Sequence, residues 1–508
     1  MMEHQGLLPT LQRLLLHSRW RNLIVFISFF IIGMILFGNT LSKPFLGDDY
    51  SVMHRLVFKK EFFIKGFFRP LSDVSPYLSY LISGLKPFLY NFFNLFFHII
   101  CSYLLYRVCL AASFFHQSSR SFIAWSAALL FLIYPYHNES IVWIAGRGSI
   151  IACFFAFLSL HFALKTVVSF WNYLWPCIFY FIGLAGYETV FPLPAIVLIL
   201  LYQPEKPFKK YIPWLIAFSL TLLLHLLIRY KVSGVIWGSY GGRLFSPSLS
   251  DYLLNLAKVF GRSFLPPSDN SYFLSIAFVL ILVVVITALY KLLKNTKEHF
   301  VFYQLTVALA LSYIIPVMFG VSTHTFEGDR LLYFSSFFLT LLMAFCLSLV
   351  KSRIIKYSVL SLIMVYFVIF LFRNNASWIK AGQITTYLIN KIKTDRKPDS
   401  KIGIINLPQE YNGAFIFRNG FKVALWINHV DSSSIHVFRT LMTEEVRHNQ
   451  GIIIPKNDFN QIFIPPNTII EQNAVIKVIH PVSGKKESYQ VRHITHLYYW
   501  NKSELIRL

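Results

Sequence analysis

Long apolar runs alternate with short polar turns from the N-terminus to residue 372. A bilayer core of about 30 Å needs about 20 apolar residues of helix, and eleven segments approach that length. They are residues 22–38, 88–109, 121–135, 149–164, 170–186, 190–202, 211–228, 271–290, 300–317, 331–350 and 354–372. The pattern predicts an α-helical polytopic membrane protein with about eleven transmembrane helices. The first helix is expected to be retained, because no small-residue cleavage site follows it.

Composition agrees with this pattern. Of the 508 residues, 56% are hydrophobic and 14% are charged, whereas a soluble protein carries about 25% charged residues. These values exclude a soluble globular enzyme and a disordered chain. The formal net charge of +24 would be typical of a nucleic-acid binder if the basic residues formed one surface.

The basic residues instead gather in alternate turns, where they act as topology signals. Those turns and the N-terminus contain Arg13, Arg19, Arg21, Arg107, Arg120, Lys165, Lys206, Lys209, Lys210, Lys291, Lys294, Lys297, Lys351, Arg353 and Lys356. Ten of the thirteen acidic residues before residue 373 fall on the other side: Asp48, Asp49, Glu61, Asp73, Glu139, Glu188, Asp251, Asp269, Glu327 and Asp329. The positive-inside rule therefore predicts a cytoplasmic N-terminus and an extracytoplasmic C-terminal region, with no nucleic-acid partner.

The chain from residue 373 to 508 has a different pattern. Its hydrophobic runs shorten to about five residues, such as 402–405 and 451–454, and turn formers such as Asn412–Gly413 bound them. Such runs are typical of strands. We predict a transmembrane catalytic domain over 1–372 and a small extracytoplasmic α/β domain of unknown role over 373–508. An amphipathic helix near 376–393 opens the second domain, which shows no repeat of fixed period.

The cysteines indicate neither a disulfide framework nor a metal site. All five lie in or at the ends of apolar runs, and none lies in the C-terminal domain. No pair has the spacing of a metal-binding motif. The simplest interpretation is that they are small buried hydrophobic residues.

An acidic pair, Asp48–Asp49, follows the first predicted span by about ten residues, and the same loop ends in Arg69–Pro70. Adjacent carboxylates at a loop start could be a solvated turn or a helix N-cap. They could also supply a general base.

Further polar groups come from other loops on the same side of the membrane. They are His137, Glu139, Trp143 and Arg147 in the second outer loop, Glu188 in the third, and Asp329 and Arg330 before the tenth span. Within the second span, Asn94 and His98 lie four residues apart, so they share a helix face, and packing between helices explains them. Acids and bases from at least four loops are thus expected to meet at one face.

This inventory fits the transfer of a sugar from a lipid phosphate better than it fits glycoside hydrolysis. An acceptor hydroxyl is a poor nucleophile and needs a carboxylate to accept its proton. The leaving phosphate needs only cations that stabilise its charge. A glycosidase would instead need two carboxylates flanking the scissile bond.

The ordered set of these segments over residues 20–350 resembles the C-type (GT-C) membrane glycosyltransferases. It is most similar to the protein O-mannosyltransferase class and its relatives with tetratricopeptide repeats, although no such repeat is found in this sequence. The matching pieces are Asp48–Asp49, Arg69–Pro70–Leu71, the stretch from Ser83 to His98, His137 to Arg147, Glu188, and Asp329 to Tyr333. Each motif alone is weak, and the specificity lies in their order.

The resemblance implies a polyprenyl- or dolichyl-phosphate sugar donor, mannose as the sugar, and an acceptor on the extracytoplasmic face. Carried over, Asp48 is the general base and Asp49 its neighbour or substitute. Donor-phosphate or substrate-binding roles fall to Arg69, His137, Glu139, Arg147, Glu188, Asp329 and Arg330, with Arg147 and Arg330 as the main phosphate contacts. The class implies metal-free catalysis without a cofactor. A divalent ion held by the two aspartates is the alternative.

The acceptor and some other functions stay open at this point. The acceptor could be a protein, or a lipid or glycan as in enzymes that modify lipid A, O-antigen or surface polysaccharides. A transporter or flippase would place its site near mid-membrane on broken helices, whereas these acids lie at outer ends. A non-catalytic receptor would explain the tail but not those acids. We expect a bacterial inner membrane with a periplasmic C-terminal domain, and an endoplasmic reticulum protein is the alternative.

Overall fold

The computed structural model describes residues 18–62, 64, 66–165, 171–236, 248–294, 298–397, 400–418, 420–438, 452–455, 475–479, 486–501 and 503–507. The chain forms two compact units. The helical unit comprises residues 1–43 and 60–377, and the C-terminal unit comprises residues 44–59 and 378–508. The sequence pattern places the division at 372/373 and assigns residues 44–59 to the membrane domain. In the structure this segment, which carries Asp48 and Asp49, packs with the C-terminal unit.

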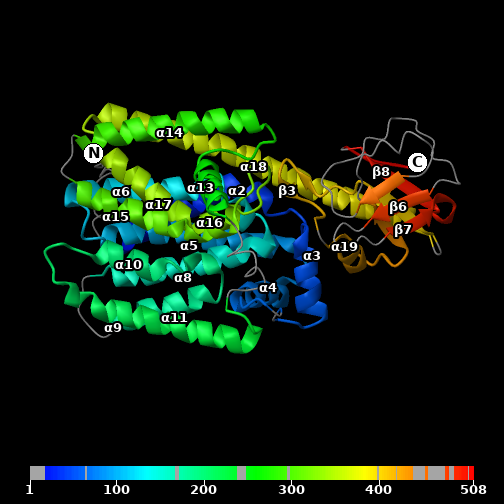
Figure 1. Cartoon of the computed structure of the whole chain (residues 1–508), viewed down its shortest axis with the longest axis horizontal. Helices are drawn as coiled ribbons and strands as arrows, with labels where there is room; N and C mark the ends of the chain where they lie inside the picture. Colours follow the sequence, from blue (N-terminus) through cyan, green and yellow to red (C-terminus); the bar gives the residue numbers. More distant parts are fainter. Residues whose placement is uncertain are drawn as a thin grey trace, which may run out of the picture. The chain divides into compact units, whose positions relative to one another are not determined.

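Apolar helices dominate the helical unit (Figure 1). Those long enough to shape the bundle are α2 (Ser18–Phe37), α4 (Pro70–Ser83), α5 (Pro87–Ala111), α6 (Gln117–Leu132), α8 (Arg147–Ala163), α9 (Trp171–Leu184), α10 (Leu193–Leu201), α11 (Ile212–Ser233), α13 (Leu249–Arg262), α14 (Ser271–Lys294), α15 (His299–Ser312), α17 (Asp329–Ser348) and α18 (Arg353–Asp395). Helix α5 packs against α2, α6 and α8, while α17 packs against α6 and α15. Several of these helices run side by side, as expected for a transmembrane bundle.

Where its residues are described, each of the eleven predicted spans coincides in large part with helix. Within the described residues, seven segments are long and apolar enough to cross a membrane: Trp20–Thr40, Pro87–Ala111, Ile144–Ala163, Phe208–Ser233, His299–Phe319, Asp329–Ser348 and Arg353–Asp395. Helices α6, α9, α10 and α14 do not meet that standard, and the last two belong to shorter apolar segments. The multi-pass membrane character follows from the seven, and the count of eleven stays a prediction.

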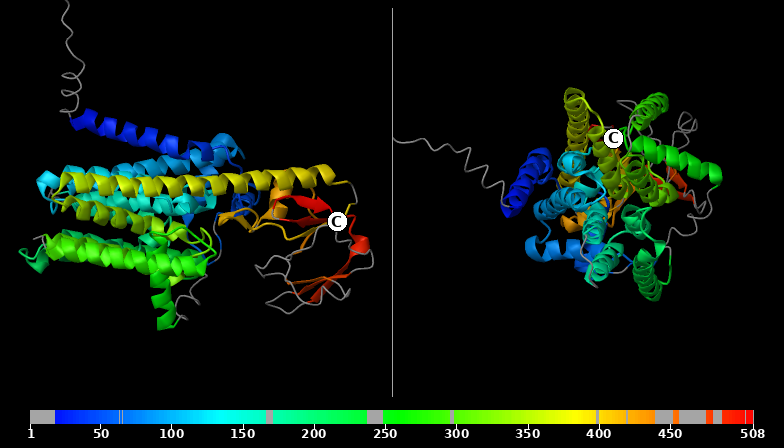
Figure 2. Two further views of the ribbon diagram at one scale, coloured as in Figure 1. Left: turned by 90° about the horizontal axis from the view of Figure 1, so that it is seen from above. Right: turned by 90° about the vertical axis from the view of Figure 1, so that its left-hand side faces the viewer.

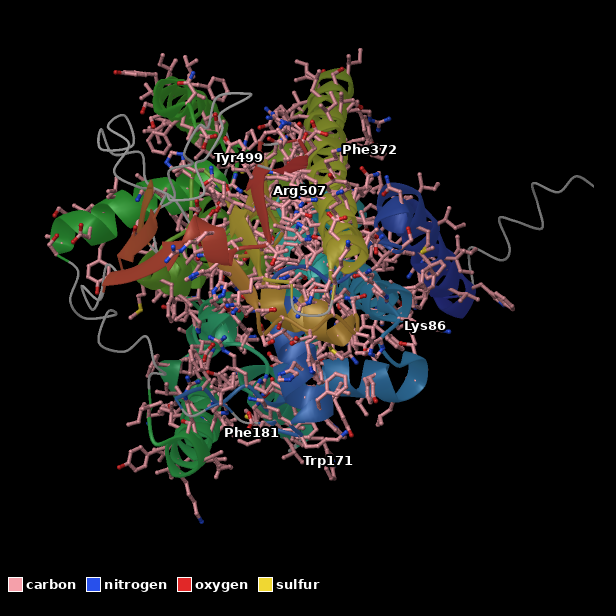
Figure 3. All side chains as sticks on the ribbon, turned by 90° about the vertical axis from the view of Figure 1, so that its right-hand side faces the viewer. Lys86, Trp171, Phe181, Phe372, Tyr499 and Arg507 are labelled. Carbon is pink, nitrogen blue, oxygen red and sulfur yellow. The ribbon has the colours of Figure 1, made fainter. Side chains whose placement is uncertain are left out.

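Outward-facing side chains of the helical unit are largely apolar. On α2, Ile27, Ile31 and Ile35 lie four residues apart and are exposed, while Phe29 of the same helix is buried. Trp171 of α9 and Phe372 of α18 likewise project from the surface (Figure 3). Exposed stripes of this kind are costly in water and favourable against lipid.

Two glycines allow the start of α8 to approach its neighbours closely. A Cβ on Gly146 would lie 2.1 Å from the carbonyl oxygen of Glu139, and one on Gly148 would lie 2.0 Å from Oγ of Ser72. Any larger residue at these positions would push α8 away from the second outer loop and from α4. The glycines on both sides of Arg147 thereby fix where that arginine enters the bundle.

The C-terminal unit is an α/β domain, as predicted. Its main sheet has the order β4-β1-β8-β9 and is formed by β1 (Ile402–Ile405), β4 (Ile435–Phe438), β8 (His496–Trp500) and β9 (Leu505–Arg507). Strand β1 is buried along its length and runs parallel to both β4 and β8. Parallel neighbours require crossovers, and one of them carries the short helix α19 (Phe421–Ile427). A second sheet joins β5 (Ile452–Pro455), β6 (Val475–Ile479) and β7 (Lys486–Gln490).

Most local predictions for this unit are confirmed. The runs 402–405 and 451–454 correspond to β1 and β5. Asn412 and Gly413 both have positive φ and join β2 (Glu410–Tyr411) to β3 (Ala414–Phe415) in a tight turn. The amphipathic helix expected at 376–393 is not separate, because it continues α18 without a break. Two further pairs of turn formers in the sequence, Pro465–Pro466 and Ser483–Gly484, lie outside the described residues.

Candidate functional site

A buried carboxylate between two arginines forms the first part of the site in the helical unit. Glu188 opens a short 3-10 helix before α10. Its Oε2 lies 2.8 Å from Nε of Arg69, and its Oε1 lies 2.9 Å from a guanidinium nitrogen of Arg229. The Arg229 side chain is 1% exposed, but that of Arg69, just before α4, is 22% exposed. Two cations against one anion leave a net positive charge, which reaches the surface only at Arg69.

A second pair lies beside the first. The guanidinium of Arg330, on α17, donates to the buried carboxylate of Glu139, on the short helix α7 (Asn138–Ile141), and the backbone N–H of Arg330 donates to the same carboxylate at 2.7 Å. Burial raises the pKa of Glu139, and the charge of Arg330 opposes that shift. The Arg330 side chain is 23% exposed. Like Arg69, Arg330 is therefore a partly exposed cation whose counter-charge is buried.

Tyr187 connects the two pairs. Its hydroxyl accepts a hydrogen bond of 3.0 Å from Nε of Arg330, and the guanidinium of Arg69 lies 4.3 Å from its ring centre. These two contacts restrict the orientation of both guanidinium groups, because each group is held by a partner in the protein. The two partly exposed arginines, Arg69 and Arg330, therefore share one aromatic support, and we call them the arginine pair.

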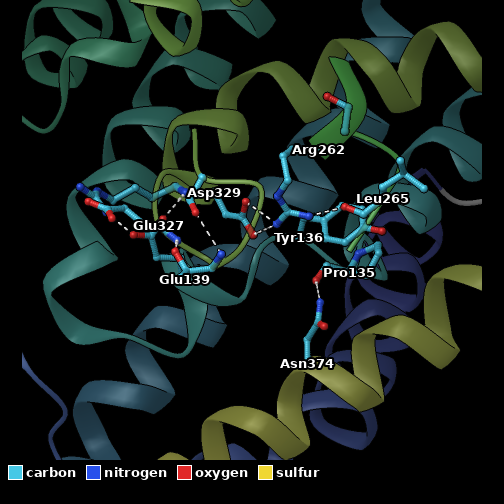
Figure 4. Close-up of polar contacts among 12 residues, drawn as sticks. Pro135, Tyr136, Glu139, Arg262, Leu265, Glu327, Asp329 and Asn374 are labelled. Atoms are coloured by element: carbon cyan, nitrogen blue, oxygen red, sulfur yellow. Dashed lines mark hydrogen bonds and ion pairs between the residues drawn. The ribbon is translucent and has the colours of Figure 1, made fainter. Parts of the chain in front are cut away.

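Asp329, the residue before Arg330, forms a third ion pair with a different partner, Arg262. Both of its carboxylate oxygens lie within 2.7 Å of one guanidinium nitrogen of Arg262, and both side chains are fully buried. The Arg262 guanidinium lies 4.9 Å from the ring centre of Tyr136. Figure 4 shows these two residues together with Glu139. The adjacent residues 329 and 330 are thus each fixed by a different partner, and the start of α17 is firmly held.

Arg147 and His137 lie deeper than the arginine pair. Arg147 is 2% exposed, and each of its guanidinium nitrogens donates a hydrogen bond: Nε to Asn94 at 2.5 Å, one Nη to Ser79 at 2.8 Å and the other to the Tyr90 carbonyl at 2.8 Å. These bonds join α8 to α4 and α5. His137 is also buried, and its Nε2 lies 2.6 Å from Oγ of Ser336. Their predicted roles toward the donor stay predictions.

His98 belongs to the same buried layer as His137. Its Nδ1 lies 2.8 Å from the Tyr333 hydroxyl, and the two histidine rings are 5.1 Å apart. Asn94 accepts from Arg147 and donates to backbone carbonyls of the second outer loop. The interpretation of Asn94 and His98 as polar packing between helices agrees with these contacts.

The acidic pair lies in the C-terminal unit, on the short helix α3 (Asp48–Met53). Asp49 is fully buried, and its Oδ2 accepts a hydrogen bond of 3.0 Å from the backbone N–H of Leu46. Asp48 is half-buried. Among the described residues, no hydrogen bond or ion pair is found for its carboxylate. The two aspartates therefore differ, because one closes a turn and the other is available.

Helix α19 and the loop before it hold this acidic segment, residues 44–59. The Gly47 N–H donates to the Ile416 carbonyl at 2.7 Å. Gly420 has a φ of +84°, and a Cβ there would lie 2.7 Å from the Gly47 carbonyl oxygen. Trp426 packs edge-on against His54 and Phe58, with ring centres 4.9 and 4.7 Å apart. Much of what positions Asp48 within its unit thus comes from residues near 420, far away in sequence.

Three residues of this arrangement were missed by sequence analysis: Tyr187, Arg229 and Arg262. Arg229 lies at the end of a leucine-rich span, and an ionisable residue in such a helix is a signal of a buried partner. Arg262 and Tyr187 carry no comparable signal. In the part of the chain that the structure describes, no three His, Cys, Asp or Glu residues are grouped as metal ligands.

Comparison with known proteins gives partial matches to one class. Protein O-mannosyl-transferase TMTC3 of Homo sapiens is 36% identical over 95 residues, which cover 18% of this chain and 10% of that protein. Protein O-mannosyl-transferase TMTC1 of Homo sapiens is 29% identical over 150 residues, covering 25% and 17%, and that of Mus musculus is 26% identical over 148 residues, covering 25% and 15%.

The predicted resemblance to the protein O-mannosyltransferase class is therefore confirmed, over a limited part of the chain. The matched segments span 10 to 17% of the length of these curated relatives. The relatives are mammalian, so a bacterial membrane stays a prediction. No family model matches the chain, and no solved structure matches it.

Proposed function

We propose that the chain is a membrane glycosyltransferase that moves a sugar, mannose by analogy with its relatives, from a polyprenyl-phosphate donor to an acceptor hydroxyl. The resemblance to protein O-mannosyl-transferases supports the reaction class. The seven candidate spans support a substrate held in the bilayer. The extracytoplasmic location of the reaction rests on the distribution of charges between the two sides of the membrane.

Asp48 is the proposed general base. The observation that carries this choice is that Glu139, Glu188 and Asp329 each have an arginine against the carboxylate. A carboxylate that accepts a proton from a hydroxyl must be ionised, reachable and not already neutralised by a cation. Asp49 fails these conditions because it is buried and accepts from the backbone. Asp48 is reachable, since it is half-buried, and no cation is found against its carboxylate among the described residues.

The arginine pair is proposed to bind the donor phosphate. The guanidinium fork matches phosphate oxygens with two parallel hydrogen bonds. Glu188 pairs with Arg69, Glu139 pairs with Arg330, and Tyr187 contacts both arginines. Phosphate binding would therefore require little rearrangement of the two arginine side chains. As the glycosidic bond breaks, charge grows on the phosphate, and cations fixed in advance stabilise it.

The remaining predicted residues are proposed to support these two functions. Glu139 and Glu188 orient the arginine pair, and Asp329 fixes the start of α17 through Arg262. Arg147 and His137 hold the helices that carry the second outer loop. None of these roles requires a cofactor, because the leaving group is already a phosphate.

The test is transfer by the purified full chain in phosphatidylcholine nanodiscs, with radiolabelled polyprenyl-phosphate mannose as donor and a panel of protein, lipid and glycan acceptors. Asp48→Asn removes the base while keeping the size of the side chain. We expect transfer to fall by about 100-fold or more, with an unchanged melting temperature. Full transfer by this variant would exclude Asp48 as the base.

Asp49→Asn is the matched control. It replaces the acceptor of the Leu46 hydrogen bond with a neutral amide, so we expect a lower melting temperature of the C-terminal unit. A loss of transfer in Asp49→Asn without loss of stability, together with an active Asp48→Asn, would assign the base to Asp49. Absence of transfer by the parent chain with every polyprenyl-phosphate sugar tested would refute the reaction class.

A further inference from the structure

Helix α13 has its apolar residues on one face and its polar residues on the other. With about 100° of rotation per residue, Leu249, Leu253 and Leu256 align along one side. Asp251, Asn255, Lys258 and Arg262 align along the other side. A capping box formed by Ser248 and Asp251 closes the first turn, so the helix is well defined at its start.

The side that carries Asn255, Val259 and Arg262 is turned toward the protein, and the leucine side is turned away from it. The Asn255 amide donates to the Val317 carbonyl at 3.1 Å, and Arg262 forms the buried pair with Asp329. The leucines on the opposite face are 76%, 59% and 45% exposed in chain order. We call these three residues the leucine stripe. A helix on the surface of a soluble protein has the reverse arrangement, with its apolar face against the core.

The position of α13 follows from its last residue. Asp329 is the first residue of a candidate span, Asp329–Ser348, so we expect the chain to enter the bilayer near this residue. Its partner Arg262, at the end of α13, is held at that level. From there the helix runs across the long helices of its unit rather than along them (Figure 2). A helix that ends at this level and crosses the spans has the direction expected of a helix that follows the membrane surface.

We propose that α13 lies in the boundary between headgroups and acyl chains, with the leucine stripe inserted among the lipids. Exposed leucines at this level face a solvent that is apolar on one side and wet on the other, which is where amphipathic helices bind. Lys258 on the opposite face points away from the acyl chains, as an ammonium must. The partner of this surface is the bilayer itself, and the contact does not depend on the proposed sugar transfer.

Fluorescence quenching in phosphatidylcholine vesicles tests the insertion. The probe is a nitrobenzoxadiazole group on a cysteine placed at position 253 by Leu253→Cys, or at 258 by Lys258→Cys as the matched control on the other face. The five native cysteines are buried or half-buried, and the labelled parent chain supplies the blank. Lipids with a doxyl group at carbon 5 or carbon 12 of an acyl chain are the quenchers.

We expect 5-doxyl lipid to quench the probe at 253 at least about twofold more than the probe at 258, because only the former reaches the acyl chains. Quenching at 253 should be stronger with 5-doxyl than with 12-doxyl lipid. Equal, weak quenching at both positions would show that water or a protein covers the stripe, and would overturn the proposal. Stronger quenching by 12-doxyl lipid would also overturn it, because the helix would then lie deep in the bilayer. Leu256→Cys, on the same stripe, gives the same test if Leu253→Cys fails to fold.

Discussion

Three buried acids of the helical unit and the acidic pair of the C-terminal unit have different surroundings. In the helical unit, Glu139, Glu188 and Asp329 each have an arginine within hydrogen-bond distance and almost no exposed surface. In the C-terminal unit, Asp49 is satisfied by backbone, and Asp48 is half-buried without a recorded cation among the described residues. From their positions in the sequence alone, all five of these acids are predicted to lie on the outer face, with no difference between them.

The difference separates two uses of a carboxylate. A buried acid with an arginine is committed to that partner, because the ion pair offsets much of the free-energy cost of removing the carboxylate from water. It serves by orienting the cation. An acid on a short helix with an open side has no such commitment and can accept a proton. The helical unit therefore contains acids that orient arginines, whereas Asp48 of the C-terminal unit is half-buried and has no cation against it among the described residues.

The largest expected effect comes from breaking the fully buried pair Arg262–Asp329. Asp329→Asn leaves the guanidinium of Arg262 without its counter-charge, and removal of one partner of a buried pair costs about 3–5 kcal/mol. We expect a pronounced fall in the melting temperature of the purified protein in detergent. Asp48→Asn, at a half-buried position where no ion pair is found among the described residues, should change stability by about 0.5 kcal/mol or less.

The double variant Arg262→Gln, Asp329→Asn is the control for this prediction. Removing both charges also removes the uncompensated guanidinium, so much of the lost stability should return. If Asp329→Asn melts like the parent chain, or if Asp48→Asn is equally destabilised, the distinction between committed and available acids fails.

The sequence predicts where the helices, the strands and the acids lie, but not which acids have a cation as partner. The membrane helices follow from apolar runs, and β1 and the Asn412–Gly413 turn follow from local residue types, because these signals act within a few residues. The sequence also predicts which loops carry the acids. Whether an acid has a cation partner depends on contacts such as that between Glu188 and Arg229, which are 41 residues apart.

Local sequence signals do not predict where the acidic segment packs, because its contacts are also with residues far away in the sequence. Residues 44–59 follow the first span, so chain continuity favours the membrane domain. Their packing is instead set by Gly420, Trp426 and the Ile416 carbonyl, more than 350 residues later. Gly420 looks like an ordinary turn residue in the sequence. Only its positive φ and its approach to Gly47 show why a side chain there is excluded.

Gly420→Ala tests whether the C-terminal unit positions the base. An alanine at φ +84° is strained by about 1–2 kcal/mol, and its Cβ would also meet the Gly47 carbonyl oxygen. We expect the acidic segment to shift and kcat for transfer to fall by about tenfold, while KM for the donor stays constant. The control Gly413→Ala carries the same kind of strain at φ +85° in the β2–β3 turn. Equal losses in both variants would indicate general destabilisation rather than positioning.

An effect no larger than that of Gly420→Ala is expected at the arginine pair, where the charge can be kept and only its geometry changed. Arg330→Lys retains a cation beside Glu139 but replaces the planar fork with a point charge. We expect the dissociation constant of polyprenyl-phosphate mannose to rise about tenfold, as for one lost charge-assisted hydrogen bond. Binding is measured by titration of the full chain in nanodiscs.

Arg229→Lys is the matched control, because Arg229 also pairs with a buried glutamate but is only 1% exposed. It should leave donor affinity unchanged, since its guanidinium has no open side to offer a phosphate. An equal loss in both variants would mean that the lysines act by loosening the ion-pair network. An unchanged affinity in Arg330→Lys would remove Arg330 from the phosphate site. A loss confined to Arg330→Lys would instead identify exposure behind a fixed counter-charge as the property that distinguishes a binding arginine from a structural one.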